Sequence, residues 1–195
     1  MHNSTKYWMD RTAKELRGES RSLAKDQDLD KLGPQYIKWL RGRLKELDKP
    51  SVLEVGCGFG RWSEALDGLY SRFVGGDIVP ARIEYANKTY IRDDRAFHTL
   101  SPDGKWTLGE KFDVVVFITV IQHLPLDLAV ELLKTARRHL KEGGRLILME
   151  WRIFDDKDQF PAGAPAHMIS KLKTDLEAAV PDLGWSGSEG RFVLG

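Results

Sequence analysis

The 195-residue sequence predicts an α/β protein with a doubly wound, mostly parallel sheet of seven strands, or of fewer if its C-terminal part is shortened. Short apolar runs alternate with segments of helical periodicity, as in consecutive βαβ units. Two of these runs, 112–118 and 145–149, are almost unbroken in apolarity, which is typical of parallel strands covered on both faces. A glycine-rich turn, 56–60, directly follows the first run. Because ligands of such sheets bind beyond the carboxyl ends of the strands, the loops at those ends are the candidate functional segments.

The expected elements follow one another along the chain. Residues 5–48 are polar and helical, with breaks near Gly18 and at Gly33–Pro34. Strands are expected at 51–55, 72–76, 95–99, 112–118, 145–149 and 191–194, the last with a very short partner at 185–186. Helices are expected after the glycine turn, at 80–90, from Pro125 to a glycine C-cap at 143–144, and at 165–180.

Composition narrows the functional classes. Thirty Lys and Arg against 29 Asp and Glu give a net charge of +1, which disfavours nonspecific binding to nucleic acid or to a membrane surface. Cys57 is the single cysteine, and there is no Cys/His cluster, so neither an internal disulfide nor a metal site is expected. No run approaches 18 apolar residues and the first ten residues do not read as a signal peptide, so we expect a cytoplasmic protein.

The segment around the first strand carries the most specific pattern. Gly56, Gly58 and Gly60 let the backbone turn sharply and pass close to a ligand, and Asp77 ends the next strand, where a carboxylate can bind a ribose diol. A dinucleotide-binding loop would have its third glycine near position 61, where this chain has Arg61. That arginine disfavours a nicotinamide oxidoreductase, while an ordinary tight turn remains the alternative for the loop taken alone.

This pattern, with Glu54 before the glycines, resembles motif I of the class I S-adenosylmethionine-dependent methyltransferases. The resemblance covers about residues 50–150, and Phe112–Asp113 resembles the start of motif IV. It implies a Rossmann-like methyltransferase fold with S-adenosylmethionine as cofactor, S-adenosylhomocysteine as product and no metal. It also implies one domain over 1–195, with a helical lid or substrate cap (1–49), a cofactor-binding core (50–150) and a C-terminal helix with a short hairpin (151–195).

The resemblance also assigns roles to residues. Glu54 would lie near the methionine amino end, Asp77 would hold the ribose, and Arg61 would meet the cofactor carboxylate, with the cofactor lying across the ends of the first and fourth strands. Leu100 and Ser101 stand where the family usually has an acid or amide for the adenine, which leaves that contact open. The implied cofactor-binding residues are Glu54, Gly56, Gly58, Gly60, Arg61, Asp77, Ile78, Leu100, Ser101, Ile118 and Thr119.

His123 follows the fourth strand and is the candidate catalytic base, because an imidazole with an ordinary pKa near 6.5 can take a proton from an acceptor. It would also face the substrate; the alternative is that it caps or packs the start of the next helix. Tyr7, Trp8 and Trp151 are candidate substrate contacts, with packing in the core as the alternative for each.

The expected activity is methyl transfer to an oxygen, nitrogen or carbon of a small molecule, by a monomer or homodimer. A protein acceptor such as an N-terminal amine is the first alternative, although Trp151 stands where the N-terminal methyltransferases have asparagine. A nucleic-acid acceptor is disfavoured by the charge and by Ile118–Ile121 in place of a base-methylation motif. The remaining alternative is a non-catalytic subunit that binds S-adenosylmethionine and supports a partner methyltransferase.

Overall fold

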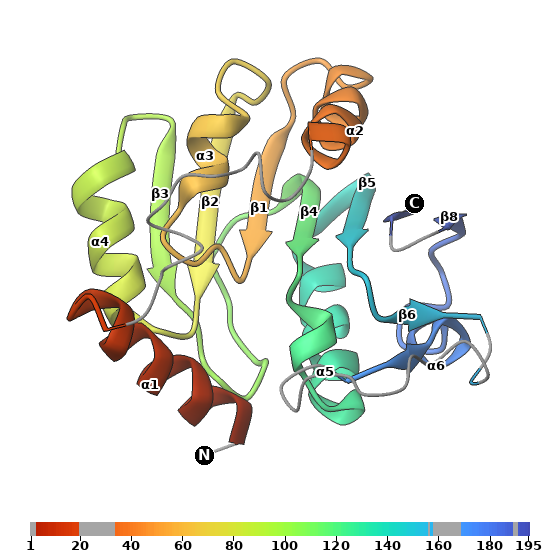
Figure 1. Ribbon diagram of the computed structural model, residues 1–195. Helices are drawn as coiled ribbons and strands as arrows, with labels where there is room; N and C mark the ends of the chain where they lie inside the picture. Colours follow the sequence, from red (N-terminus) through yellow and green to blue (C-terminus); the bar gives the residue numbers. More distant parts are fainter. Residues whose placement is uncertain (1–2, 20–33, 156, 158–168, 189–190) are drawn as a thin grey trace. The chain divides into compact units, whose positions relative to one another are not determined.

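The computed structural model describes residues 3–19, 34–155, 157, 169–188 and 191–195 (Figure 1). Its main sheet has seven strands in the order β3-β2-β1-β4-β5-β9-β8, mostly parallel, which confirms the predicted fold class. The chain divides into two compact units, Met1–Leu100 and Ser101–Gly195.

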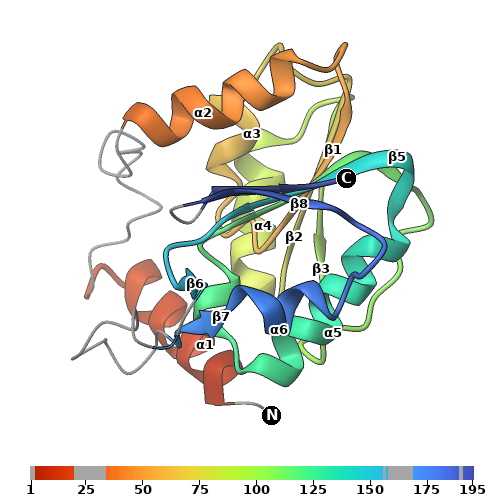
Figure 2. The same ribbon diagram turned by 90° about the vertical axis from the view of Figure 1, so that its right-hand side faces the viewer.

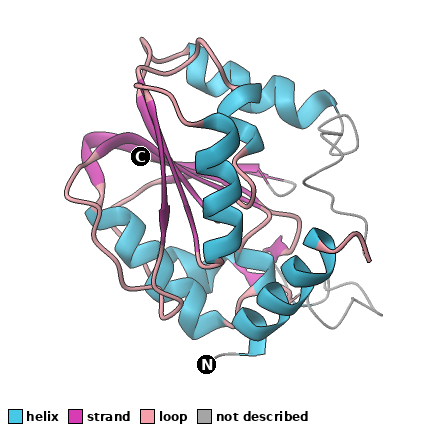
Figure 3. Cartoon of the chain, turned by 90° about the vertical axis from the view of Figure 1, so that its left-hand side faces the viewer, coloured by secondary structure: helices cyan, strands magenta, loops and turns pink. Residues whose placement is uncertain are grey.

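The first unit contains three parallel strands with helices packed against them. Residues pair in register from Ser51 with Arg72 and from Phe73 with Arg95, and every residue of β1 is buried, as its apolar sequence predicts. Figure 3 shows the long helix α4 lying against these strands. In chain order the elements are α1 (Asn3–Leu16), α2 (Pro34–Lys45), β1 (Ser51–Val55), α3 (Arg61–Ala65), β2 (Arg72–Asp77), α4 (Pro80–Tyr90) and β3 (Arg95–Thr99).

The second unit pairs β4 and β5 in parallel and closes with an antiparallel hairpin. The hairpin, β8 with β9, pairs with β5 through β9, so the predicted short C-terminal partner strands are confirmed. Helices α5 and α6 lie side by side in this unit (Figure 2). Its elements are β4 (Phe112–Ile118), the 3-10 turn η2 (Ile121–His123), α5 (Leu126–Arg138), β5 (Leu140–Met149), β6 (Ile153–Phe154), β7 (Lys171–Leu172), α6 (Lys173–Glu177), β8 (Trp185–Ser188) and β9 (Arg191–Leu194).

Two expected helices are wrong in their bounds. The helix after Pro125 ends at Arg138 rather than at the glycine pair, because Gly143 (φ 69°) and Gly144 lie inside β5, where the pairing shifts from Phe112–Leu140 to Val114–Arg145. The glycines thus lie at an irregularity in the pairing of β4 with β5 and do not cap a helix. Part of the helix expected at 165–180 lies outside the described residues.

Where 165–180 is described, the chain first forms β7 and only then a short helix. Lys171 donates its backbone N–H to the Arg152 carbonyl at 2.8 Å, so this stretch is held in an unpredicted two-stranded sheet with β6. Among the described residues, no helix combines the length and apolarity needed to cross a membrane.

Candidate functional site

The glycine loop lies between β1 and α3 and has the sharp turn that its sequence predicts. Gly56, Gly58 and Gly60 have φ angles of 77°, 57° and 84°, all in the left-handed region that favours glycine. Gly60 is also constrained by space, because a Cβ atom there would lie 2.8 Å from Cε1 of Phe97 and 3.0 Å from Cβ of Ala86. The loop therefore needs glycine at position 60 for two separate reasons.

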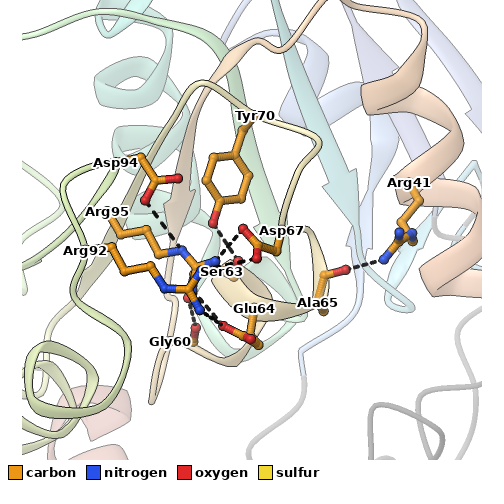
Figure 4. A network of polar contacts seen from close by, with 10 residues as sticks. All are labelled: Arg41, Gly60, Ser63, Glu64, Ala65, Asp67, Tyr70, Arg92, Asp94 and Arg95. Carbon is orange, nitrogen blue, oxygen red and sulfur yellow. Dashed lines mark hydrogen bonds and ion pairs between the residues drawn. The ribbon is translucent and has the colours of Figure 1, made fainter.

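Polar contacts hold the start of α3 directly behind this loop (Figure 4). The Ser63 hydroxyl donates to the Gly60 carbonyl at 2.7 Å, and the Tyr70 hydroxyl donates to the Ser63 carbonyl at 2.7 Å. The buried guanidinium of Arg95, from β3, donates to the Glu64 carboxylate at 2.7 Å. Side chains from β3 and from the segment after α3 thus fix the end of the glycine loop.

Asp77, at the end of β2, binds the same loop from the other side. One carboxylate oxygen accepts the Gly58 N–H at 2.9 Å and the other accepts the Val79 N–H at 2.9 Å. Burial raises the pKa of Asp77, against the lowering effects of Arg82 and of these backbone N–H groups. Asp77 consequently shapes the loop, and its contact with the ribose stays a prediction.

Glu54, the fourth residue of β1, is the second acid at this edge. It is 1% exposed, and burial raises its pKa to about 8, although the nearby Arg61 lowers it. Its Oε2 atom has no hydrogen-bond partner within the part of the chain that the structure describes. A buried carboxylate oxygen without a donor is costly for the folded protein. The ammonium group of an amino-acid ligand would supply that donor, so the residues present fit the methionine end of S-adenosylmethionine.

The remaining residues predicted to bind cofactor have different surroundings. Leu100 is buried, and its Cδ1 atom lies 2.5 Å from the position that a Cβ of Gly76 would take, so its side chain covers β2. Ile78 is half-buried and Ser101 is exposed. Adenine contacts from Leu100 and Ser101 stay predictions.

Trp8 of α1 packs on an arginine of α4. The Arg82 guanidinium carbon lies 5.1 Å from the centre of the Trp8 ring and 5.3 Å from the centre of the Phe59 ring in the glycine loop. Arg82 also donates to Thr12 at 2.8 Å and pairs with Glu15 at 3.4 Å. This packing places Trp8 one side chain away from the glycine loop; a contact of Tyr7 or Trp8 with substrate stays a prediction.

In the second unit, the predicted residues lie in the turn that follows β4. Ile118 is buried at the end of the strand, and Thr119 has a φ of 56°, which is unusual for a β-branched residue. His123 is 9% exposed in η2, and its Nε2 atom lies 3.4 Å from Nε2 of Gln122. Strained backbone of this kind is concentrated at functional sites.

Trp151 lies beside the same turn. Its backbone N–H donates to Oε1 of Gln122 at 3.0 Å, while its side chain is 38% exposed. The alternative that Trp151 belongs to the core is therefore wrong.

The residue that organises this turn was not among the predicted site residues. Glu150 is 0% exposed at the end of β5, and its carboxylate accepts the backbone N–H groups of Val120, Ile121 and Gln122. Burial raises the pKa of Glu150 to about 7, and burial lowers the pKa of the nearby Lys171 to about 8. The available signal was an acid directly after the buried apolar run 146–149. Arg82 was missed because nothing in its local pattern distinguishes it from a surface arginine.

Among the described residues, no group of three or more His, Cys, Asp or Glu side chains could hold a metal ion. A protein-family model described as a methyltransferase domain matches residues 20–185, which is most of the chain. The chain belongs to the S-adenosylmethionine-dependent methyltransferases.

Curated relatives include two ubiquinone biosynthesis O-methyltransferases. The one from Cereibacter sphaeroides (strain KD131) is 28% identical over 130 residues, which are 66% of this chain and 48% of the relative. The one from Haemophilus ducreyi is 28% identical over 124 residues, which are 60% of this chain and 52% of the relative. The chain thus spans about half the length of the curated relatives that it matches.

Solved structures share the fold. The S-adenosylmethionine-bound amino pentose methyltransferase CalS10 of Micromonospora echinaspora has a TM-score of 0.71 at 16% identity, over 90% of this chain and 97% of that one. Magnesium protoporphyrin IX methyltransferase from Synechocystis PCC 6803 has a TM-score of 0.64 at 17% identity, over 100% of this chain and 96% of that one. Both are similar to this chain in fold.

Proposed function

We propose that this methyltransferase transfers a methyl group to an oxygen, nitrogen or carbon atom of a small molecule, with its cofactor on the glycine loop of the first unit. The observation that carries the proposal is the pair of acids at the ends of β1 and β2. Asp77 shapes the loop through two backbone N–H groups, and Glu54 holds a buried carboxylate oxygen without a donor. The small-molecule acceptor is supported by relatives named for ubiquinone biosynthesis.

In this proposal the residues of the first unit bind and orient the cofactor. Glu54 accepts from its ammonium group, Arg61 meets its carboxylate, and Asp77 accepts from its ribose hydroxyls. Bound S-adenosylmethionine supplies an activated methyl group, so the protein mainly aligns the reactants and excludes water. We further propose that residues 1–195 act as one methyltransferase domain, in which 1–49 cap the cofactor-binding core 50–150.

His123 is the proposed catalytic residue. A nucleophile that carries a proton gives up that proton as its lone pair forms the bond to the methyl carbon and the carbon–sulfur bond breaks, and the His123 imidazole takes it. The segment around His123 has exposed apolar side chains, since Leu126, Trp151 and Ile169 are 38–40% exposed. Two of them, Trp151 and Ile169, flank Gln122 through backbone hydrogen bonds of 3.0 and 2.7 Å. This surface favours an acceptor with an apolar body.

Titration calorimetry with the whole chain tests the cofactor assignment. S-adenosylhomocysteine should bind, and NADH should not. Asp77→Ala should weaken the affinity by roughly 1.5–3 kcal/mol, the scale of lost hydrogen bonds to a charged group. Glu84→Ala, which removes an exposed acid on α4, is the matched control and should bind like the wild type. Preferential binding of NADH would refute the proposal, and an unchanged affinity in Asp77→Ala would refute the ribose role.

Methyl transfer from labelled S-adenosylmethionine to 3,4-dihydroxybenzoate and to aniline tests the catalytic proposal with an oxygen and a nitrogen acceptor. His123→Ala should lower kcat by about 10²–10⁴-fold for the acceptor that must lose a proton. Unchanged turnover in this variant across pH 6–9 would make His123 a structural residue. Tight binding of S-adenosylhomocysteine without transfer to any acceptor would favour the non-catalytic subunit.

A further inference from the structure

The turn between β4 and α5, residues Thr119–His123, has an acceptor for each of its five backbone N–H groups. The Thr119 N–H donates to the Met149 carbonyl at 2.9 Å, and the His123 N–H donates to the Val120 carbonyl at 3.0 Å within the turn. The three N–H groups between them all donate to Glu150, at 2.6, 2.9 and 3.1 Å. One side chain therefore satisfies the centre of the turn that carries His123.

The Glu150 carboxylate stabilises the turn that it binds. Three N–H donors supply much of the hydration that burial removes, and hydrogen bonds to an ionised acceptor are about twice as strong as neutral ones. Removing Glu150 would leave the N–H groups of Val120, Ile121 and Gln122 without this acceptor at a buried site, which would force the turn to open toward water.

Three backbone N–H groups and one lysine oppose the rise that burial causes in the pKa of Glu150. Lys171, 3% exposed on β7, is the cation that lowers the pKa of Glu150 against the effect of burial. Gln122 binds the segments that precede β6 and β7. Its side-chain oxygen accepts the Trp151 N–H, and its backbone carbonyl accepts the Ile169 N–H. The turn is thus attached to the end of β5 through the Glu150 carboxylate and the Met149 carbonyl, and to the segments before β6 and β7 through the side chain and the backbone carbonyl of Gln122.

We propose that Glu150 is the positioning residue of this enzyme: by binding three consecutive backbone N–H groups, it fixes η2 and thereby the orientation of the His123 imidazole. The catalytic consequence rests on the proposed role of His123. Glu150 itself does not touch the reacting atoms. Its loss should therefore reduce turnover while leaving S-adenosylhomocysteine binding to the glycine loop intact.

Amide hydrogen exchange followed by NMR tests the positioning without reference to activity. Glu150→Gln keeps the shape of the side chain but replaces one acceptor by an amide NH₂ group. We expect exchange at Val120, Ile121 and Gln122 to become about 10–100-fold faster, while amides 115–117 of β4 stay within about twofold. Glu142→Gln, the same substitution at an exposed position of β5, the strand that precedes Glu150, is the control and should change none of these rates.

The His123 Cε1–H resonance, assigned through its absence in His123→Ala, should shift or broaden in Glu150→Gln and stay unchanged in Glu142→Gln. Glu150→Asp, which keeps the charge but is one methylene shorter, should give intermediate exchange rates and a resonance closer to that of the wild type. Unchanged exchange at the three amides would overturn the proposal, because it would show that Glu150 does not hold the turn. Equal acceleration throughout β4 would also overturn it, because it would show only global destabilisation.

Kinetics separate this proposal from the proposed function. With an acceptor that the wild type methylates, Glu150→Gln should lower kcat at least tenfold, with KM for S-adenosylmethionine and the Kd of S-adenosylhomocysteine within about twofold of the wild type. A matching loss of S-adenosylhomocysteine affinity would instead place Glu150 in the cofactor site and refute the proposal. If the wild type methylates none of the acceptors, the proposed function fails, while the exchange rates and the His123 resonance still decide whether Glu150 positions the turn.

Discussion

The two acids at the carboxyl ends of β1 and β2 differ in the hydrogen-bond donors that their oxygens have. Both Asp77 oxygens accept a backbone N–H, whereas the described residues offer no donor to Oε2 of Glu54. Burial raises the pKa of both carboxyl groups, that of Glu54 to about 8. Asp77 therefore stabilises the glycine loop even without a ligand, whereas the donor for Oε2 of Glu54 would have to come from a ligand.

The buried acid predicts a pH dependence of stability. The pKa of Glu54 is raised from 4.5 to about 8, so the folded state binds more protons than the unfolded state between these values. Its contribution is complete below about pH 4.5 and is lost as the pH rises toward 8. In urea unfolding, the free energy of unfolding of Glu54→Gln relative to wild type should therefore increase by at least about 1 kcal/mol from pH 5 to pH 8.

The control for this prediction is Glu84→Gln on the exposed side of α4, which should show no such trend. Because Glu150 titrates in the same direction in both proteins, its contribution cancels in the comparison. A difference between Glu54→Gln and wild type that is independent of pH would show that the Glu54 carboxylate is not held neutral in the folded protein.

Two glycines of the loop predict different defects when replaced by alanine. Gly60→Ala forces a Cβ against Phe97 in addition to the left-handed strain, so it should lower the free energy of unfolding by about 2–4 kcal/mol. Gly58→Ala meets no atom within 4 Å and should cost only about 1 kcal/mol. If the cofactor passes over the loop, Gly58→Ala should weaken S-adenosylhomocysteine binding more than folding; equal stability of the two variants in urea would contradict the packing at Gly60.

At the scale of elements, Arg82 of α4 links α1 to the glycine loop. Arg82 contacts the Trp8 ring, the Thr12 hydroxyl and the Glu15 carboxylate on α1, and the Phe59 ring of the glycine loop on its other side. Glu15 is 3% exposed, so the ion pair is buried. The N-terminal helix and the glycine loop therefore share a single cationic side chain.

Arg82→Ala should detach α1. It leaves the Glu15 carboxylate buried with Arg11 as its other ion-pair partner, and truncation of one member of a buried pair costs about 3 kcal/mol in free energy of unfolding. Arg17→Ala, which breaks an exposed pair with Glu19 at the end of the same helix, should change stability by less than about 1 kcal/mol. Urea denaturation measures both; equal stability of the two variants would show that α1 is held by other contacts.

Two elements differ from those that the sequence predicts. The glycine pair 143–144 looks like a helix C-cap, yet α5 ends at Arg138 because the β4–β5 pairing extends back to Leu140. The two-stranded β6–β7 sheet has only two residues in each strand, too short for an apolar alternation to appear. Strand pairing between distant segments determines both the end of α5 and the β6–β7 sheet, and hydrophobic periodicity along the chain does not predict such pairing.

For the whole molecule, cofactor binding predicts a stabilisation that needs no acceptor. S-adenosylhomocysteine at 100 times its Kd should stabilise the folded chain by about 2.7 kcal/mol, which corresponds to a rise in Tm of about 5–10 °C for a protein of this size. NADH at the same concentration should give no shift. His123→Ala should keep the full shift and Asp77→Ala should reduce it at equal ligand concentration; loss of the shift in His123→Ala would place His123 in the cofactor site.

Local sequence patterns predict the fold class, the glycine loop, the acids at 54 and 77 and the place of His123 after the fourth strand, because apolar periodicity, glycine spacing and strand-end acids are visible within a few residues. Which groups pair with these side chains follows from the folded structure. Glu150 meets N–H groups 28–30 residues away, and Arg82 meets α1 residues 67–70 positions away. A buried charge or N–H group needs a hydrogen-bond partner, and the fold can supply that partner from a distant part of the chain. Local sequence patterns contain no information about such distant partners.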